Sequence, residues 1–429
     1  MEKQRLNYGK TFLLGFGFFG VSVIWATYNA FVPLFLANKF GLSPAWIGFF
    51  MTLDNIAALF IQPLVGSWSD RLRTKIGRRL PFILIGAPVA AVAFGIIPIA
   101  AALPLFVACT VTLILSMAIW RTPVVALMPD ITPSRFRSQA NGVINFMGGI
   151  GSIIAFLIGS KLYETNQAFP FWLGSILVVL AAIMVFIFIK EPKIYDENPD
   201  VEKPNLLKSL STILKEKDHS AIRIFLAILF WFIAYNAIEA FFTLYANKHL
   251  LLPEADGVRL LSQLSLLFVI FALPSGYIGG KIGRRITISI GLVLMIISML
   301  FMYILPKDVL TIEVFKAPIL GTVPVVGLFL MLAGIAWALI NINSLPMVVD
   351  LTDAVQIGTY TGLYYLFSTL AAITGPNING WIVQLTGNNY ASIMIIGPIF
   401  MAFALISILG VRRGEAKELH EESIFKQEG

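Results

Sequence analysis

The sequence is short of charge and contains very little cysteine or histidine. Charged residues fill 13% of its 429 positions, whereas a soluble domain carries about 25%. The single cysteine, Cys109, excludes a disulfide within the chain. The three histidines fall in or beside polar loops, so we expect no metal site. The sequence also lacks a nucleophile–base pair and a GKS/T phosphate loop, so we expect no enzyme activity, no ATP-driven pump and no cofactor.

Hydrophobic residues make up 58% of the chain and gather in long runs. A helix needs about 20 apolar residues to cross a bilayer, and these runs are continuous rather than alternating, which disfavours a barrel. We therefore predict an all-α integral membrane protein with twelve transmembrane helices. The helices are expected near residues 11–37, 44–69, 80–102, 104–128, 138–160, 170–190, 221–247, 260–280, 286–305, 318–345, 357–383 and 390–410.

The basic residues predict the orientation in the membrane. If the N-terminus is cytoplasmic, a large majority of the 31 lysine and arginine residues fall in cytoplasmic segments. Both termini then lie inside, in the plasma (inner) membrane. Because the basic residues sit in short loops between apolar runs, we expect the lipid bilayer rather than nucleic acid as the partner. We also expect a monomer.

One long hydrophilic insert divides the chain into two halves of six helices each. We place the N-terminal half at 1–190, a cytoplasmic linker at 191–220, the C-terminal half at 221–411 and a cytoplasmic tail at 412–429. Apolar residues at helical spacing between 206 and 214 predict an amphipathic helix on the membrane surface. The alternative is a disordered charged linker.

Two motifs recur in the two halves. GSWSDRLRTKIGRR at 66–79 returns as GYIGGKIGRR at 276–285, with Gly280 in the place of Asp70. The segment 127–149 returns at 345–367, so that Asp130 corresponds to Asp350. Two six-helix halves repeated in one orientation resemble the plan of the major facilitator superfamily.

The stretch QPLVGSWSDRLRTKIGRRLPF at 62–82 resembles the loop between helices 2 and 3 of sugar carriers in that superfamily. Together with segments 121–149 and 230–246 it is similar to the branch that contains sucrose transporters, with glycoside–cation symporters as more distant kin. The resemblance implies a secondary active transporter for a glucoside or disaccharide, usually coupled to protons. Gln62 is uncharged where the glycoside–cation symporters carry acidic residues, so their sodium chemistry is not implied.

Three ionisable residues lie inside predicted spans, where a charge is costly unless it is paired or faces a cavity. Asp54 and Glu239 fall near the midplane, and Arg121 lies eight residues before Pro129. We expect them to face a central cavity and to couple transport to a proton. The alternatives are a permanent ion pair, or an Arg121 that extends to the cytoplasm.

Amide and aromatic side chains within the spans are candidates for sugar binding, because sugars need directional hydrogen bonds and flat apolar faces. Their alternative roles are helix packing and the lipid interface. The candidates are Trp25, Tyr28, Asn29, Asn55, Asn141, Asn145, Tyr235, Asn236, Trp337, Asn341, Tyr360, Tyr364 and Asn377.

The repeated basic loops are candidates for a cytoplasmic gate. We expect Asp70 to bond to Arg78 or to a helix N-terminus across the two halves; the alternative is that it only tempers the basic cluster. The gate residues are Gly66, Asp70, Arg71, Gly77, Arg78, Arg79, Asp130, Gly283, Arg284 and Arg285.

These observations favour a proton-coupled symporter for a sugar such as maltose or sucrose, working by alternating access. Two alternatives stay open. One is an exporter of drugs or metabolites from the same superfamily, and the other is a membrane sugar sensor that does not transport.

Overall fold

The computed structural model describes residues 7–132, 137–191, 210–211, 213, 218–318, 320–352 and 356–414. The expected amphipathic helix at 206–214 lies outside these residues except for 210, 211 and 213. In the N-terminal half the elements are α1 (Tyr8–Leu34), η1 (Phe35–Lys39), α2 (Pro44–Phe50), α3 (Leu53–Arg71), α4 (Leu80–Ile96), η2 (Ile97–Ile99), α5 (Leu103–Ile131), α6 (Arg137–Thr165) and α7 (Phe169–Phe188).

The C-terminal half has the same order of long helices and one small sheet. Its elements are α9 (Ser220–Leu244), η4 (Tyr245–His249), α10 (Glu254–Ile282), α11 (Arg284–Ile304), α12 (Lys307–Leu310), β1 (Glu313–Ala317), β2 (Gly321–Pro324), α13 (Val325–Val349), α14 (Ile357–Leu385), η5 (Tyr390–Ser392) and α15 (Ile393–Leu409). The all-α membrane fold is confirmed. The tenth span begins later than expected, at Val325 rather than near 318, and the short antiparallel β1–β2 hairpin precedes it.

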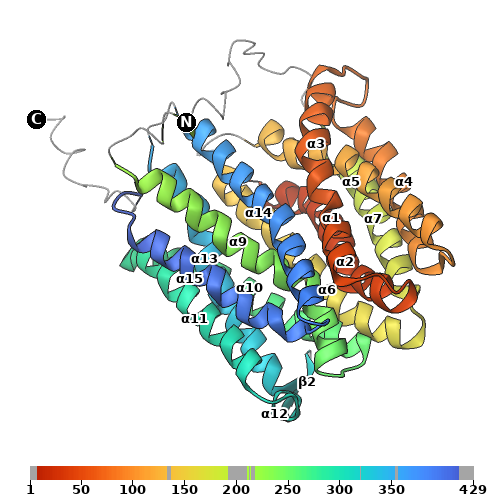
Figure 1. Ribbon diagram of the computed structural model, residues 1–429. Helices are drawn as coiled ribbons and strands as arrows, with labels where there is room; N and C mark the ends of the chain where they lie inside the picture. Colours follow the sequence, from red (N-terminus) through yellow and green to blue (C-terminus); the bar gives the residue numbers. More distant parts are fainter. Residues whose placement is uncertain are drawn as a thin grey trace, which may run out of the picture.

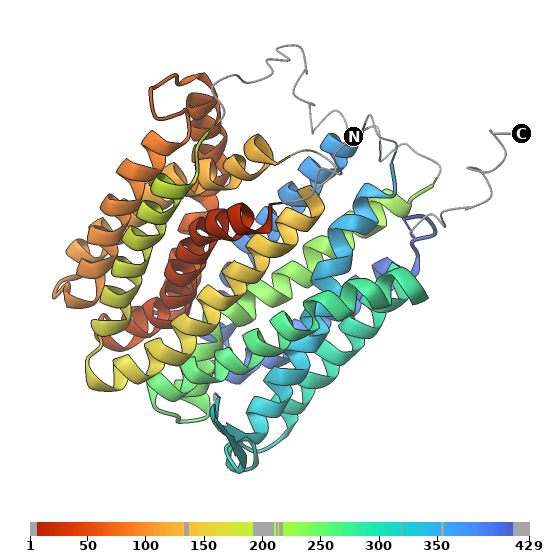
Figure 2. The same cartoon turned by 180° about the vertical axis from the view of Figure 1, so that it is seen from behind.

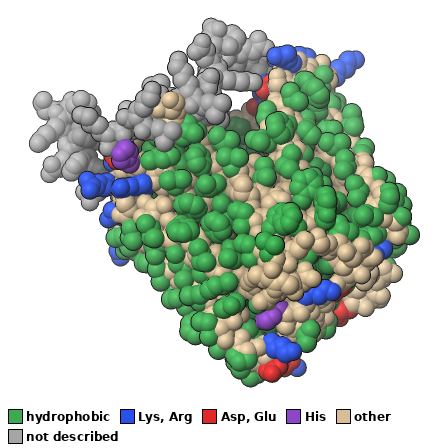
Figure 3. All heavy atoms as spheres, viewed as in Figure 1, with side chains coloured by type: hydrophobic (Ala, Val, Ile, Leu, Met, Phe, Trp, Pro, Cys, Tyr) green, Lys and Arg blue, Asp and Glu red, His purple; other side chains and the backbone are tan. Residues whose placement is uncertain are grey.

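Eleven helices among the described residues are long and apolar enough to cross a membrane. The remaining expected span is α14, which is long enough to cross a membrane at 29 residues but carries polar side chains such as Tyr364, Asn377 and Asn379 along its length. Figure 3 shows a broad hydrophobic surface with lysine and arginine gathered towards its two ends. Large apolar side chains such as Leu273 and Ile406 are exposed. The chain is therefore a multi-pass membrane protein.

The two halves lie side by side in Figure 1, with the red-to-yellow half on the right and the green-to-blue half on the left. We name the end that carries the loop 72–79 the basic side and the end that carries the β1–β2 hairpin the hairpin side. The halves touch through α1 with α9, α2 with α14, and α6 with α10. In the view from behind, yellow α6 runs beside green α10 (Figure 2).

Hydrogen bonds between the halves gather on the hairpin side. The Glu254 carboxylate, at the first turn of α10, accepts from the Asn38 amide and the Tyr163 hydroxyl, each at 2.5 Å. Arg259 of the C-terminal half pairs with Glu164 of the N-terminal half. The described ion pairs on the basic side each stay within one half. The hairpin side is thus the closed end of the molecule.

Candidate functional site

The three ionisable residues from the spans come from three helices, α3, α5 and α9. The expected second span is not one helix: it breaks at Met51 and Thr52, so that Asp54 lies in the first turn of α3. No proline or glycine marks this break in the sequence. A carboxylate in the first turn of a helix faces unpaired backbone N–H groups, which favour its charged form.

Asp54 is close enough to Arg121 and Glu239 to interact with both electrostatically. Arg121 also interacts with Tyr365 of α14. Among the described residues, Arg121 forms no ion pair within 4.0 Å, so the alternative of a permanent contact ion pair is not what the structure contains. Because Arg121 is not in direct contact with Asp54 or Glu239, there is room for a proton or a ligand between these three side chains.

Glu239 is bound by the other half of the molecule. The Asn29 amide donates to the Glu239 carboxylate at 3.0 Å, joining α1 to α9. Asn29 precedes the start of η1 at Phe35 by six positions, and Glu239 precedes the start of η4 at Tyr245 by six. The two residues therefore occupy equivalent places in the first helix of each half, and their hydrogen bond lies on the axis that relates the halves.

Two polar groups of α1 are buried beside this centre without a hydrogen-bond partner among the described residues. They are the indole N–H of Trp25 and the hydroxyl of Tyr28. The two rings pack edge-on with centroids 5.5 Å apart, and Tyr28 interacts electrostatically with Asp54. Buried donors are almost always satisfied in folded proteins, so these two mark a place where a ligand or water belongs.

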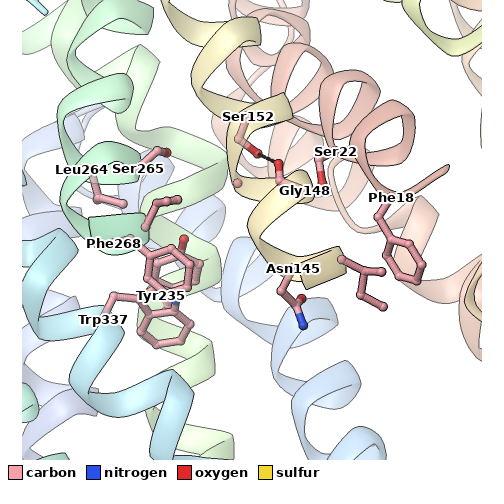
Figure 4. Close-up of a pocket in the computed structure, with 13 residues that line it drawn as sticks. Phe18, Ser22, Asn145, Gly148, Ser152, Tyr235, Leu264, Ser265, Phe268 and Trp337 are labelled. Carbon is pink, nitrogen blue, oxygen red and sulfur yellow. Dashed lines mark hydrogen bonds between the residues drawn. The ribbon is translucent and has the colours of Figure 1, made fainter. Parts of the chain in front are cut away.

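A pocket of about 230 Å³ lies between the halves, with walls from α1, α6, α9, α10 and α13 (Figure 4). Tyr235 and Trp337 are stacked on one wall with ring centroids 3.7 Å apart, and Asn145 lies on the opposite wall. The remaining lining is apolar or hydroxylated, and none of it carries a charge. It consists of Phe18, Ser22, Ile144, Gly148, Gly149, Ser152, Leu264, Ser265, Phe268 and Val269.

The sequence reasoning missed the serine and phenylalanine residues of this pocket. Ser22 lies one helical turn before Trp25, and Ser265 one turn before Phe268. The helical spacing that grouped Trp25 with Tyr28 could have found them. Serines are common on packed membrane helices, however, so composition alone did not single them out.

Several expected sugar ligands also have contacts within the protein. Tyr364 shares a hydrogen bond with Ser344 at 3.0 Å, and Tyr360 packs against Phe225 inside the C-terminal half. The amides of Asn145 and Asn236 donate to carbonyls one turn earlier on their own helices. The other expected ligands are placed as follows: Asn55 donates to Asp54, Asn141 is exposed on α6, Asn341 is half-buried on α13, and Asn377 donates to Thr52.

The basic loop of the N-terminal half forms a closed network. Arg79 is buried and bonds to Asp70 at 2.5 Å, to Asp130 at 3.0 Å and to Ser69. Arg78 pairs with Asp130 at 2.8 Å. The expected bond from Asp70 to Arg78 or across the halves was therefore wrong, because the partner is Arg79 of the same half. Gly66 faces α5 and Arg71 is exposed at the end of α3.

Glu191, just past α7, completes this network and was missed. Its carboxylate accepts from the backbone N–H groups of Arg78, Arg79 and Leu80 at 2.8–2.9 Å, and so caps the start of α4. Gly77 has φ +121, and a Cβ there would lie 2.5 Å from the Glu191 carboxylate. The sequence gives no local signal for a cap that comes from more than a hundred positions away.

The corresponding loop of the C-terminal half is simpler. Gly283 again has a left-handed backbone, with φ +97. Arg284 pairs with Asp350, the counterpart of Asp130, which pairs with Arg78. Arg285 donates to the backbone carbonyl of Val411 at 2.8 Å. Among the described residues, no cluster of histidine, cysteine and acidic side chains could hold a metal ion.

The fold is that of a membrane protein with two equivalent helical halves around a partly polar centre. A family model, that of the Major Facilitator Superfamily, matches residues 14–262 and 257–426. The chain therefore belongs to the Major Facilitator Superfamily.

Curated relatives include both exporters and sugar carriers. Multidrug resistance protein 1 of Bacillus subtilis is 27% identical over 39% of this chain and 42% of its own length. Sucrose transport protein SUC3 of Arabidopsis thaliana is 28% identical over 35% of this chain. The matched regions span 42% and 29% of these two relatives, well under two thirds. The isoprimeverose transporter of Lactiplantibacillus pentosus is 22% identical over 96% of this chain and 88% of its own length.

The solved structure of the nucleoside transporter NupG superposes with a TM-score of 0.66 at 16% identity, covering 95% of this chain and 98% of that one. At this identity the likeness supports the fold only.

Proposed function

We propose that the chain carries a neutral sugar across the membrane together with a proton, by opening its two sides in turn. The observation that supports this most is the pair of unpartnered donors, Trp25 and Tyr28, beside the charged centre. Burying a polar group without a partner costs free energy. A hydroxylated ligand would supply acceptors to both donors, and the nearby carboxylates would supply the proton site.

The pocket favours an uncharged ring as the cargo. The stacked Tyr235 and Trp337 offer an aromatic face, which suits the apolar face of a sugar ring. Ser22, Ser152 and Asn145 can exchange hydrogen bonds with hydroxyl groups. A lining without charge would not compensate a charged substrate. The names of two relatives, a sucrose transport protein and an isoprimeverose transporter, agree with a sugar cargo.

Asp54 is the proton site in this proposal. A carboxylate held away from water can bind a proton near neutral pH, and Arg121 competes with that proton for the negative charge. We place the basic side in the cytoplasm of the cell, since basic loops of inner-membrane proteins stay inside. The closed hairpin side then faces outward, and the arrangement described above is the inward-facing one.

Uptake by proteoliposomes tests the proposal. A panel of labelled disaccharides and glucosides is offered with and without an inward proton gradient. We expect at least one sugar to accumulate above its external concentration only when the gradient is present. If no sugar enters under the gradient, symport is wrong.

The variant Asp54→Asn tests the proton site. It keeps the shape of the side chain but cannot take up a proton. We expect it to abolish uphill accumulation and to leave exchange of sugar for sugar intact. Unchanged accumulation would remove Asp54 from coupling.

An exporter is the second candidate, because a multidrug resistance protein is similar over 39% of the chain. Loading the same proteoliposomes with a cationic dye distinguishes the two. A proton-driven loss of dye, without any sugar uptake, would favour the exporter.

A further inference from the structure

The break in the second span is held by the other half of the molecule. Thr52, the residue that precedes α3, is fully buried. Its hydroxyl donates to the Phe49 carbonyl at 2.7 Å and accepts from the Asn377 amide of α14 at 3.2 Å. Through Thr52, the C-terminal half is therefore hydrogen-bonded to the start of the helix that carries Asp54.

Around this hydrogen bond, the backbones of α2 and α14 pack closely against each other. A Cβ on Gly48 would lie 2.3 Å from the Pro376 carbonyl, and one on Gly380 would lie 2.5 Å from the Pro44 carbonyl. The backbone N–H of Ala45 also donates to the Gln384 side chain at 3.3 Å. This contact, which we name the α2–α14 seam, belongs to the closed hairpin side. Opening that side must pull Asn377 away from Thr52.

We propose that Thr52 and Asn377 link the protonation of Asp54 to the opening of the α2–α14 seam. Asn377 is then a positioning residue rather than a sugar ligand. The inference rests on the proposed function only in naming Asp54 as the proton site. The contact itself is independent of the cargo.

The sign of the linkage follows from the helix geometry. In this proposal burial disfavours the charged carboxylate of Asp54 whether the seam is closed or open. The helix N-terminus favours the charged form only while Thr52 holds the break in place and keeps Asp54 in the first turn of α3. Linkage between two equilibria is reciprocal, so binding a proton to Asp54 favours the open seam. Acid on the hairpin side would therefore open the side from which cargo and proton enter.

Other groups also face Asp54 and must be separated from it in a test. They are Arg121 of α5, Glu239 of α9, Tyr28 of α1 and the neighbouring Asn55. Glu239 could respond to pH on its own. The variant Asp54→Asn separates the two groups, because any pH response left in that variant comes from Glu239 or another group and not from Asp54.

Thiol labelling measures the seam without any sugar. The reporter is Ala45→Cys in a Cys109→Ser background, since Ala45 is buried in the closed seam. A membrane-impermeant maleimide is applied from the hairpin side in acidic and in mildly alkaline buffer. The rate is divided by that of Asp308→Cys, an exposed site on α12, which removes the intrinsic pH dependence of the reagent.

We expect the normalised rate of the parent reporter to rise about fivefold or more in acid, within the usual range of coupling between sites. Adding Thr52→Val, which removes the hydroxyl and keeps the shape, should make the rate high at both pH values. Thr52→Ser, which restores the hydroxyl, should return the pH dependence. Asp54→Asn should also abolish it.

The matched control is Thr374→Val on α14. The Thr374 hydroxyl donates to carbonyls of its own helix, at 2.8 Å and 3.4 Å, so the same chemical change should leave the reporter like the parent. The linkage is wrong if the parent shows no pH dependence, if Thr52→Val responds like the parent, or if Thr52→Ser behaves like Thr52→Val. Because no sugar is present, these outcomes are separate from a failure of sugar uptake.

Discussion

The two halves carry the same K-I-G-R-R loop and hold it in different ways. In the N-terminal half, Arg78 and Arg79 share two aspartates and a third carboxylate, Glu191, caps the following helix. In the C-terminal half, Arg284 has one aspartate and Arg285 bonds to a backbone carbonyl at the end of α15. In the N-terminal loop, Arg79 contacts two carboxylates. In the C-terminal loop, the hydrogen bond described for Arg285 is to the Val411 carbonyl, just past α15.

The difference shows that a repeated motif preserves a turn more faithfully than it preserves partners. Gly77 and Gly283 both keep a left-handed backbone, which only glycine adopts without strain. Asp130 and Asp350 both receive an arginine. Asp70, by contrast, has no acidic counterpart at Gly280, so the pair that Asp70 forms with Arg79 is not repeated at that position.

The largest expected effect is a difference in stability between variants of Arg79 and Arg285, the second arginine of each loop. Arg79→Ala removes one of the two arginines that pair with the largely buried Asp130 and also the partner of Asp70, and we expect a loss of about 3 kcal/mol in the free energy of unfolding. Arg285→Ala removes the hydrogen bond to the Val411 carbonyl among its contacts, and we expect a smaller loss of about 1.5 kcal/mol. Thermal unfolding in detergent measures both. Equal losses would contradict the contrast between a charge-locked and a backbone-held loop.

An intermediate effect is expected at the cap that Glu191 forms on α4, for which the described part of the C-terminal half shows no counterpart at the start of α11. Glu191→Ala leaves three backbone N–H groups at the start of α4 without their acceptor and should cost about 1–2 kcal/mol. Glu191→Gln keeps an acceptor oxygen and should lose about 0.5 kcal/mol through the missing charge. Unfolding in detergent again gives the values. If alanine and glutamine behave alike, the cap acts through charge rather than through hydrogen bonds.

The smallest effect is expected at Asp218, which forms an ion pair with Arg413 beyond the end of α15. Hydrogen bonds from Ser220, together with the Arg413 guanidinium 2.5 Å away, hold the pKa of Asp218 below its usual range. A lowered pKa means that the charged form stabilises the fold above the ordinary value near 3.9. Asp218→Asn should therefore lower the unfolding midpoint slightly at neutral pH and not at all in strong acid. A deficit that persists in acid would exclude an electrostatic origin.

The sequence predicted features that repeat or that follow one helix. Long apolar runs located the spans, and the repeat matched Asp130 with Asp350, each of which pairs with an arginine. The grouping of Trp25, Tyr28 and Asn29 on one helix face placed all three near the charged centre. Their roles in binding stay predictions.

Features that depend on distant partners could not be predicted. Arg78 and Arg79 are neighbours, and only the turn at Gly77 decides which of them reaches Asp70. The break at Thr52 contains no proline or glycine, and its partner Asn377 is on α14. The β1–β2 hairpin was hidden because its second strand runs directly into the apolar start of α13.

The hydrogen bond between Asn29 and Glu239 also bears on how such a protein could arise by gene duplication. If the two halves were identical, they would carry the same residue at this position. Two amides or two carboxylates would then face each other at the axis between the halves. Two charged carboxylates at that distance would repel each other in a medium of low dielectric constant. An amide facing a carboxylate satisfies both groups, and it exists only after the two copies have diverged. The contact between Asn29 and Glu239 therefore needs two different side chains at equivalent positions, which two identical halves could not supply.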